Sequence, residues 1–436
     1  MLHYLTGLIF IATAFFAIYK IKMFGARGIS KHWFAGAFAL KLIAAFAMWL
    51  IYTHHYTDRS KADIFRYYDD AKVMQHLLKN HKSEYFKFFY QTKSSNNEVN
   101  TLLKHTNNWD THNGSNLYGN NRLIIRVNML LNLFSFGSYA VHAIVFSFLS
   151  FLGLFWIFRF FSHQFNGHKW LFFLSVFAFP SIVFWSSGIL KESLIFFFLG
   201  LILNCGIYAL KGRKPIARTI VVGLAFLLLF QTRAIIALIL IPLALGFIWN
   251  KLKIQRRVFL PYFIMLFIAF SALTESKRIA GKDFYELLVE KRMAFEELST
   301  TNTTQSGIAA INYTADGYSI LKSTPIALIN SIFRPTPWEA NGLLMRIASV
   351  ENVLLFFMLI LLIIYPIPIV KNKNILWFAL LFALANLLVV GLTTPILGAI
   401  SRYRIIGLLF FLVTYIQLVD FNKIINKHPK SKTVII

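Results

Sequence analysis

The chain has 436 residues, of which 57% are hydrophobic and only 14% are charged, and its mean hydropathy is +0.60. Soluble domains carry about a quarter charged residues, so this composition excludes an ordinary soluble protein and indicates a membrane protein. The formal charge of +26 would suggest nucleic-acid binding in a soluble chain, but its distribution along the sequence favours membrane topology and predicts no nucleic-acid partner.

Apolar runs recur along the whole chain, with lengths close to the roughly 20 residues that cross a bilayer core. They are 2–19, 33–52, 138–161, 170–187, 194–210, 220–230, 234–249, 259–273, 353–370, 376–392 and 405–419. The two short runs on either side of "FQTRA" (230–234) form either two spans or one broken hairpin of half-helices. The predicted fold is an all-α polytopic membrane protein with about 11 transmembrane helices (between about 10 and 12).

Basic residues follow alternate apolar runs. They cluster at 20–31, 159–169, 211–218, 251–257, 371–373 and 423–432. If the spans alternate, these clusters share one side, which the positive-inside rule makes cytoplasmic. Of the 18 acidic residues, seven lie between Thr53 and Asn121 and nine between Thr274 and Glu351, and both segments are then external. We therefore predict an N-terminus outside and a C-terminus in the cytoplasm.

This topology predicts five segments, two of which are extended external loops with amphipathic interfacial helices. They are a two-span anchor (1–52), a first external loop with membrane-parallel helices (53–137), a central bundle (138–273), a second external loop (274–351), and C-terminal spans with a basic cytoplasmic tail (352–436). The cytoplasmic connections are short and basic, so any chemistry is expected in the external loops.

The first external loop contains "IFRYYDDA" (64–71), with two adjacent carboxylates, Asp69 and Asp70. The residues at 64, 68, 71, 75 and 78, most of them apolar or aromatic, recur at helical spacing, which predicts a helix lying on the membrane with its aromatic face down. Two interpretations remain open for the carboxylates. They are the solvated edge of this helix, with Asp70 paired to Arg66 at i,i+4, or they are a catalytic or metal-binding pair.

The second external loop begins with a predicted amphipathic helix at 282–298 and ends in "SIFRPTPWEANGLLMR" (331–346). Its two prolines bar a regular helix, so Arg334, Trp338 and Glu339 are expected on a rigid extended turn. A guanidinium, an indole and a carboxylate so close together suit a sugar or a phosphate.

Charged residues also mark three other external positions. They are Lys191 and Glu192 in "FWSSGILKES" (184–193), Arg233 in the break "QTRA", and Arg402, Tyr403 and Arg404 at the start of the last span. Grouped guanidiniums would bind phosphate oxygens bidentately. The alternatives are a structural Lys191–Glu192 pair and arginines that anchor to lipid headgroups. Lys41, in the middle of a span, is costly unless it is paired or reaches the headgroups.

Three of these features together resemble the GT-C glycosyltransferases, multi-pass enzymes that use polyprenyl-phosphate-linked donors. They are the large external loop with "YYDDA" (67–71), "PSIVFWSSGILKES" (180–193) and "SRYR" (401–404). The resemblance implies that Asp69 or Asp70 is the general base and that Arg402 and Arg404 hold the lipid phosphate. Some members use a divalent cation, Mg or Mn, which Asp69 and Asp70 would bind here. The chain also resembles Wzy-type polysaccharide polymerases and O-antigen ligases, which have two large external loops.

The sequence therefore predicts an enzyme of the bacterial inner membrane that transfers a sugar from a polyprenyl-phosphate-linked donor to a glycan or lipid acceptor on the external face. Its partners would be membrane lipid, that donor and the acceptor. No P-loop, GxGxxG or CxxC motif occurs, which fits chemistry driven by the phosphate leaving group. The alternatives are a polymerase or ligase, a transporter or flippase for lipid-linked glycan, and a non-catalytic envelope-assembly subunit.

Overall fold

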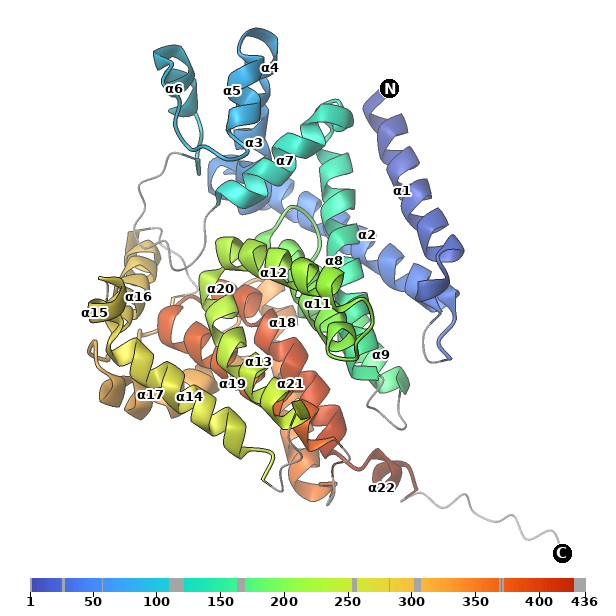
Figure 1. Cartoon of the computed structure of the whole chain (residues 1–436), viewed down its shortest axis with the longest axis vertical. Helices are drawn as coiled ribbons and strands as arrows, with labels where there is room; N and C mark the ends of the chain where they lie inside the picture. Colours follow the sequence, from blue (N-terminus) through green and yellow to red (C-terminus); the bar gives the residue numbers. More distant parts are fainter. Residues whose placement is uncertain are drawn as a thin grey trace, which may run out of the picture. The chain divides into compact units, whose positions relative to one another are not determined.

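The computed structural model describes residues 2–25, 28–56, 58–109, 121–162, 169–252, 257–281, 283–301, 307–367, 370 and 372–426, and over these ranges the fold is helical (Figure 1). The β-type pairings within these ranges are two isolated bridges, Gly307 with Ile396 and Pro366 with Val419. The predicted all-α class is thus confirmed for the described part of the chain. The chain divides into two compact units, Met1–His163 with Val176–Leu238, and Gln164–Ser175 with Ile239–Ile436, called unit 1 and unit 2 below.

Unit 1 combines long apolar helices with a group of short ones. Its helices are α1 (Leu2–Lys20), α2 (Lys31–His54), α3 (Asp63–Gln75), α4 (Leu77–Asn80), α5 (Lys82–Lys87), α6 (Asn97–Leu103), α7 (Arg122–Ser135), α8 (Tyr139–Ser162), α10 (Pro180–Trp185), α11 (Lys191–Ala209) and α12 (Pro215–Thr232). Two more helices, α9 (Lys169–Phe177) and α13 (Ala234–Leu252), contain the boundaries between the units.

Helices α8 and α11 form the closest helix pair of unit 1, and Figure 1 shows them side by side. Glycines meet where they cross: a Cβ atom built on Gly153 would collide with the backbone of Phe196, and one on Gly200 would collide with the backbone of Gly153. The two backbones are therefore in direct contact, an approach that only glycine permits.

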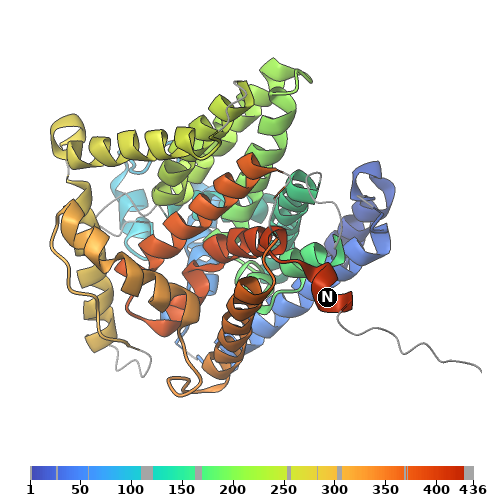
Figure 2. The ribbon, with the colours of Figure 1, turned by 90° about the horizontal axis from the view of Figure 1, so that it is seen from below.

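Unit 2 is a bundle in which α19 packs against α17 and α21, seen as the orange-to-red helices of Figures 1 and 2. Its helices are α14 (Leu260–Thr274), α15 (Ser276–Ala280), α16 (Phe284–Thr301), α17 (Gly317–Phe333), α18 (Leu343–Ile364), α19 (Lys373–Thr393), α20 (Leu397–Tyr403), α21 (Ile405–Leu418) and α22 (Phe421–Asn426). The helix expected at 282–298 corresponds to α16. A Cβ atom on Gly391 would collide with the backbone of Ala327, so α17 and α19 also touch through their backbones.

Seven described helices are long and apolar enough to cross a membrane, or eight if the bent pair α20–α21 is one span. They are α2, α8, α11, α12, α13, α18 and α19, and they indicate a multi-pass membrane protein. The described residues do not confirm the predicted count of about 11. Two of the expected spans, α1 and α14, are shorter apolar helices.

The apolar run 170–187, expected as one span, is split into α9 and α10, of nine and six residues. Pro180 begins α10, and because proline lacks a backbone N–H, a continuous helix cannot pass through it without losing a hydrogen bond. The runs 220–230 and 234–249, expected to be short, belong instead to α12 and α13, of 18 and 19 residues, each long enough to span.

Helix α3 differs from its predicted position on a lipid surface. Ile64, Tyr68 and Ala71, the face expected to lie on the membrane, are buried within unit 1 with exposures of 2%, 4% and 0%. Ile64 and its neighbour Phe65 join a core cluster with Met48 and Leu190. Helical spacing of apolar residues shows that one face of a helix is shielded from water, but it does not show whether protein or lipid covers that face. This is why α3 was expected on the membrane surface although it lies inside unit 1.

Candidate functional site

The two adjacent carboxylates of α3 have different surroundings. Asp70 is fully buried, and its oxygens accept the backbone N–H groups of Asn107 and Asn108 at 2.7 Å each, with a longer contact of 3.4 Å from the Asn107 side chain. Burial raises the pKa of Asp70, although these N–H groups and the charge of Arg66 act in the opposite direction. Asp70 therefore fastens α3 to the segment at 107–108.

The predicted pairing of Asp70 with Arg66 does not form. Arg66 donates instead to the carbonyl of Asn107 at 3.3 Å, so both side chains bind the same segment rather than each other. Nothing in the sequence could indicate this partner, because Asn107 lies 37 residues from Asp70.

Asp69, in contrast, is partly exposed and bound by one arginine. Nε and Nη2 of Arg59 donate to its two carboxylate oxygens at 2.7 Å each, a bidentate arrangement. The side chains of Arg59 and Asp69 are 53% and 28% exposed. The guanidinium of Arg59 also lies 4.2 Å from the ring centre of Phe65. The sequence gives no sign that Arg59 is a partner of Asp69, because its position in the short 3-10 turn before α3 carries no motif.

The charged residues of "FWSSGILKES" lie at the start of α11. Glu192 is 1% exposed, and its Oε1 lies 3.9 Å from Nη1 of Arg233, the arginine between α12 and α13. Two of the predicted site residues are thus brought together within unit 1. Lys191 is the first residue of α11 and is half-buried.

Lys41, the lysine in the middle of α2, is buried and paired. Its Nζ donates to the hydroxyl of Ser186 at 2.7 Å and to the carbonyl of the same residue at 2.9 Å. The carbonyl of Ser186 also accepts the hydroxyl of Ser193 at 3.1 Å. These bonds fix the turn between α10 and α11, where Gly188 has a φ of +80°.

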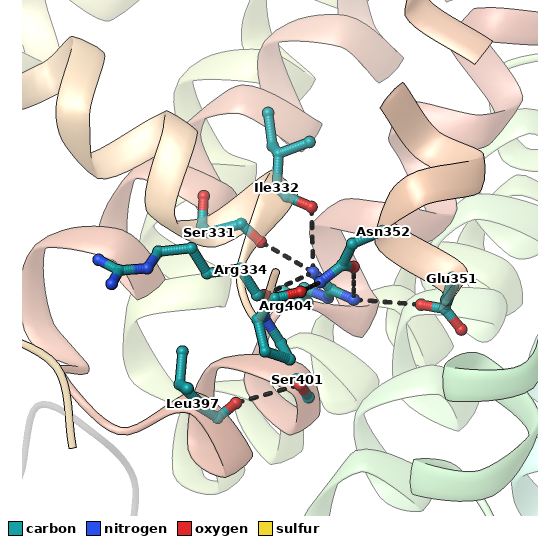
Figure 3. Close-up of polar contacts among 9 residues, drawn as sticks. Ser331, Ile332, Arg334, Glu351, Asn352, Leu397, Ser401 and Arg404 are labelled. Atoms are coloured by element: carbon teal, nitrogen blue, oxygen red, sulfur yellow. Dashed lines mark hydrogen bonds and ion pairs between the residues drawn. The ribbon is translucent and has the colours of Figure 1, made fainter. Parts of the chain in front are cut away.

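Arg404 is the centre of a buried polar network in unit 2 (Figure 3). Its Nη1 donates to the carbonyls of Ser331, Ile332 and Arg334 at 3.1–3.3 Å, at the end of α17. Its Nη2 donates to Asn352 at 2.6 Å and to Glu351 at 3.2 Å, both on α18. Arginine donors that point at helix-end carbonyls satisfy groups that the helix itself leaves unpaired.

The guanidinium of Arg404 therefore holds α17 and α18 to the bend between α20 and α21. It is 1% exposed, and among the described residues its Nη1 and Nη2 have hydrogen-bond partners and its Nε has none. Because internal acceptors bind both terminal nitrogens, the guanidinium of Arg404 stabilises the fold and does not offer its paired N–H donors to a ligand. Neither Glu351 nor Asn352 had been singled out, since both lie within an apolar helix.

Two residues before it, Arg402 has a different setting. It is half-buried, and its guanidinium carbon lies 5.5 Å from the ring centre of Tyr403. Tyr403 in turn packs on Phe295 of α16, with ring centres 6.0 Å apart. Arg402 is therefore partly accessible and lies against the ring of Tyr403.

The turn between α17 and α18 contains the predicted group of Arg334, Trp338 and Glu339. Arg334 and Glu339 form an ion pair, and the backbone N–H of Thr336 donates to the second oxygen of Glu339 at 2.9 Å. Burial alone would raise the pKa of Glu339, but Arg334 and the Thr336 N–H outweigh it and hold the pKa at about 2. Trp338 stands out at 84% exposure.

A third network joins α7 to α8. Asn128 donates its amide to the carbonyl of Ile124 at 2.8 Å, so its oxygen faces Nδ1 of His142 at 2.7 Å. Nε2 of His142 then accepts the hydroxyl of Ser135 at 2.9 Å. The order of groups is that of a nucleophile, a base and an orienting amide. All three side chains are 0% exposed, which closes the hydroxyl to substrate and makes the network a tie between the helices.

Among the described residues, no group of three or more His, Cys, Asp or Glu side chains is arranged to hold a metal ion. Comparisons with protein families, with curated proteins and with solved structures found no match to the chain. The fold and composition define the class, a multi-pass helical membrane protein.

Proposed function

We propose that this chain is a glycosyltransferase of the bacterial inner membrane, similar to the GT-C enzymes, with its N-terminus outside and its C-terminus in the cytoplasm. It would transfer a sugar from a polyprenyl-phosphate-linked donor to a glycan or lipid acceptor on the external face. The observation that carries the proposal is the contrast between Asp69 and Asp70. Asp70 is buried and bound by backbone N–H groups, whereas Asp69 is partly exposed and paired with the exposed Arg59.

Asp69 is the proposed general base. It would accept the proton of the acceptor hydroxyl while the hydroxyl oxygen bonds to the anomeric carbon and the bond from that carbon to the phosphate oxygen breaks. A carboxylate held by two charge-assisted bonds is a weak base. Arg59 must therefore leave Asp69, and the phosphate of the donor is the natural competitor for its guanidinium.

Each unit by itself carries further proposed binding residues. In unit 2, the indole of Trp338 suits stacking on a sugar ring, next to the Arg334–Glu339 pair. Arg402 is the better candidate for a phosphate contact in unit 2, because the terminal nitrogens of Arg404 already bind internal acceptors. In unit 1, Lys191, Glu192 and Arg233 remain proposed binding residues.

The test is glycan transfer by membranes that contain the full chain, supplied with a panel of synthetic polyprenyl-phosphate hexoses. Asp69→Asn should lower transfer by about 100-fold or more, the usual effect of losing a general base. Asp58→Asn is the matched control, because Asp58 is an exposed carboxylate in the same segment whose side-chain partners among the described residues are Ser60 and Lys61. Full transfer by Asp69→Asn membranes with normal protein levels would refute the assignment.

A polymerase or ligase would give the same loss but with a polymeric acceptor, so acceptor length separates these enzymes from a simple transferase. If the protein is a transporter, the variants would change how much lipid-linked sugar reaches the outer face. Membranes that contain the wild type would then show no sugar transfer to an externally supplied acceptor, and neither would the variants.

A further inference from the structure

Three arginines of unit 1 gather around one tyrosine ring. The guanidinium carbons of Arg159, Arg213 and Arg218 lie 5.6, 5.8 and 4.7 Å from the ring centre of Tyr208, near the end of α11. The electron-rich face of a tyrosine ring attracts cations, so the ring holds the three charges near one another. These three side chains are called the arginine cluster below.

The turn between α11 and α12 brings Arg213 back to this ring. Gly212 has a φ of +71°, and its N–H donates to the carbonyl three residues earlier at 2.9 Å. The N–H of Arg213 donates to the carbonyl of Tyr208 at 3.1 Å. This pair of bonds is a Schellman motif, which ends a helix and redirects the chain. Arg218 follows in the first turn of α12, and Arg159 lies in the last turn of α8, so the ends of three helices supply the cluster.

The hydrogen-bond acceptors of the cluster within the described part of the chain are neutral. Nη2 of Arg159 donates to the hydroxyl oxygen of Tyr208 at 3.0 Å, and Nη1 of Arg218 donates to the carbonyl of Arg213 at 2.6 Å. No carboxylate of a described residue forms an ion pair with any of the three arginines. Arg213 is exposed and the other two are half-buried. The fold therefore orients three positive charges without neutralising them.

The cluster lies where the membrane-spanning surface of unit 1 ends. Helices α8, α11 and α12 are all long and apolar enough to cross a membrane. Ile216, the second residue of α12, is 77% exposed, and Ile220, Leu224 and Leu227 continue the same face with exposures of 57–58%. Side chains so apolar and so exposed mark where the hydrocarbon begins. The turn just before them is then at the depth of the lipid phosphates.

We propose that the arginine cluster binds the headgroup of an anionic phospholipid, and that a lipid with two phosphates binds more tightly than a lipid with one. Guanidiniums donate bidentately to phosphate oxygens, and three cations exceed the charge of a single phosphodiester. In the predicted orientation this end of the spans is cytoplasmic, where anionic lipids attract basic segments. The site does not depend on the proposed transferase activity, which rests on Asp69.

The test is native mass spectrometry of the full chain in a neutral detergent, titrated separately with cardiolipin, phosphatidylglycerol and phosphatidylcholine. The wild type should bind one cardiolipin most tightly and phosphatidylcholine least tightly. Arg213→Gln/Arg218→Gln should raise the Kd for cardiolipin by about tenfold or more, because charge-assisted bonds are lost. The matched control is Lys20→Gln/Lys22→Gln, which removes the same charge from two exposed lysines at the end of α1 and just after it, and which should leave this Kd unchanged.

Arg218 also donates to the backbone, so the loss of its guanidinium can disturb the fold. Arg213→Lys/Arg218→Lys keeps both charges and removes the planar fork, so it should fold and raise the Kd by a smaller factor. Inorganic pyrophosphate tests for a free anion: if it binds to the wild type as tightly as cardiolipin does, the lipid assignment is wrong. Equal Kd values for the two anionic lipids would refute the preference for two phosphates. Equal binding of cardiolipin and phosphatidylcholine, or equal weakening in the lysine control, would overturn the proposal.

Discussion

Replacing Arg404 by glutamine should destabilise unit 2 severely. The guanidinium is buried, pairs with Glu351, and satisfies the carbonyls of residues 331, 332 and 334. Breaking a buried ion pair by removing one partner costs about 3–5 kcal/mol, because the other charge is left without compensation. A glutamine amide can recover one of the lost bonds but cannot span both α17 and α18. We therefore expect the free energy of unfolding to fall by about 3–5 kcal/mol.

The measurement is reversible unfolding of the detergent-solubilised chain in mixed micelles. Arg402→Gln is the control two residues earlier, in α20; its half-buried guanidinium lies against Tyr403, so the variant should lower the free energy of unfolding by less than Arg404→Gln does. In the double variant Arg404→Gln/Glu351→Gln, part of the loss should return, since the carboxylate whose charge Arg404 balances is also removed. Equal stability of the Arg404→Gln and Arg402→Gln variants would refute the structural role assigned to Arg404.

The remaining predictions concern a helix crossing and an ion pair. Gly200→Ala should destabilise unit 1 by about 1–3 kcal/mol, because the new methyl group would collide with the backbone of α8. Gly206→Ala, on the same helix, is the control and should be neutral or stabilising, because its methyl group would meet a side-chain atom 4.0 Å away. Thermal unfolding in detergent compares the two variants. The depressed pKa of Glu339, about 2, means that its ion pair with Arg334 stabilises the fold fully above the unfolded pKa near 4.5 and less as pH falls toward 2. The wild type should therefore lose its stability advantage over Glu339→Gln between about pH 5 and pH 2, and a constant difference across that range would contradict the assigned pKa.

The sequence predicts the apolar helices well, since a helix occurs at each of the expected runs. Hydropathy measures length and apolarity but not continuity, so the split of 170–187 at Pro180 and the full lengths of α12 and α13 were not anticipated. The same limitation applies to α3. Its apolar spacing is real, but the face is covered by protein instead of lipid, and only the tertiary fold decides which.

For the candidate site, the residue types in the sequence identify the important charged side chains, but the sequence does not identify the groups that these side chains bind. Asp70 and Arg404 stand out in the sequence as charged residues in a largely apolar chain, and both side chains are buried, where a charge requires hydrogen-bond or ionic partners. Most of those partners, the N–H groups of 107–108 and the carbonyls that end α17, are backbone atoms distant in sequence. Backbone groups carry no signature in residue type, so a buried structural charge and an available functional one look alike in the sequence.

The crossing of α8 and α11 has a mechanical consequence. With glycine on both helices, no side chain lies between the backbones at that point, so a residue with a Cβ atom at either position would push the helices apart. The spacing between α8 and α11 is therefore set by backbone atoms and not by the size of any side chain.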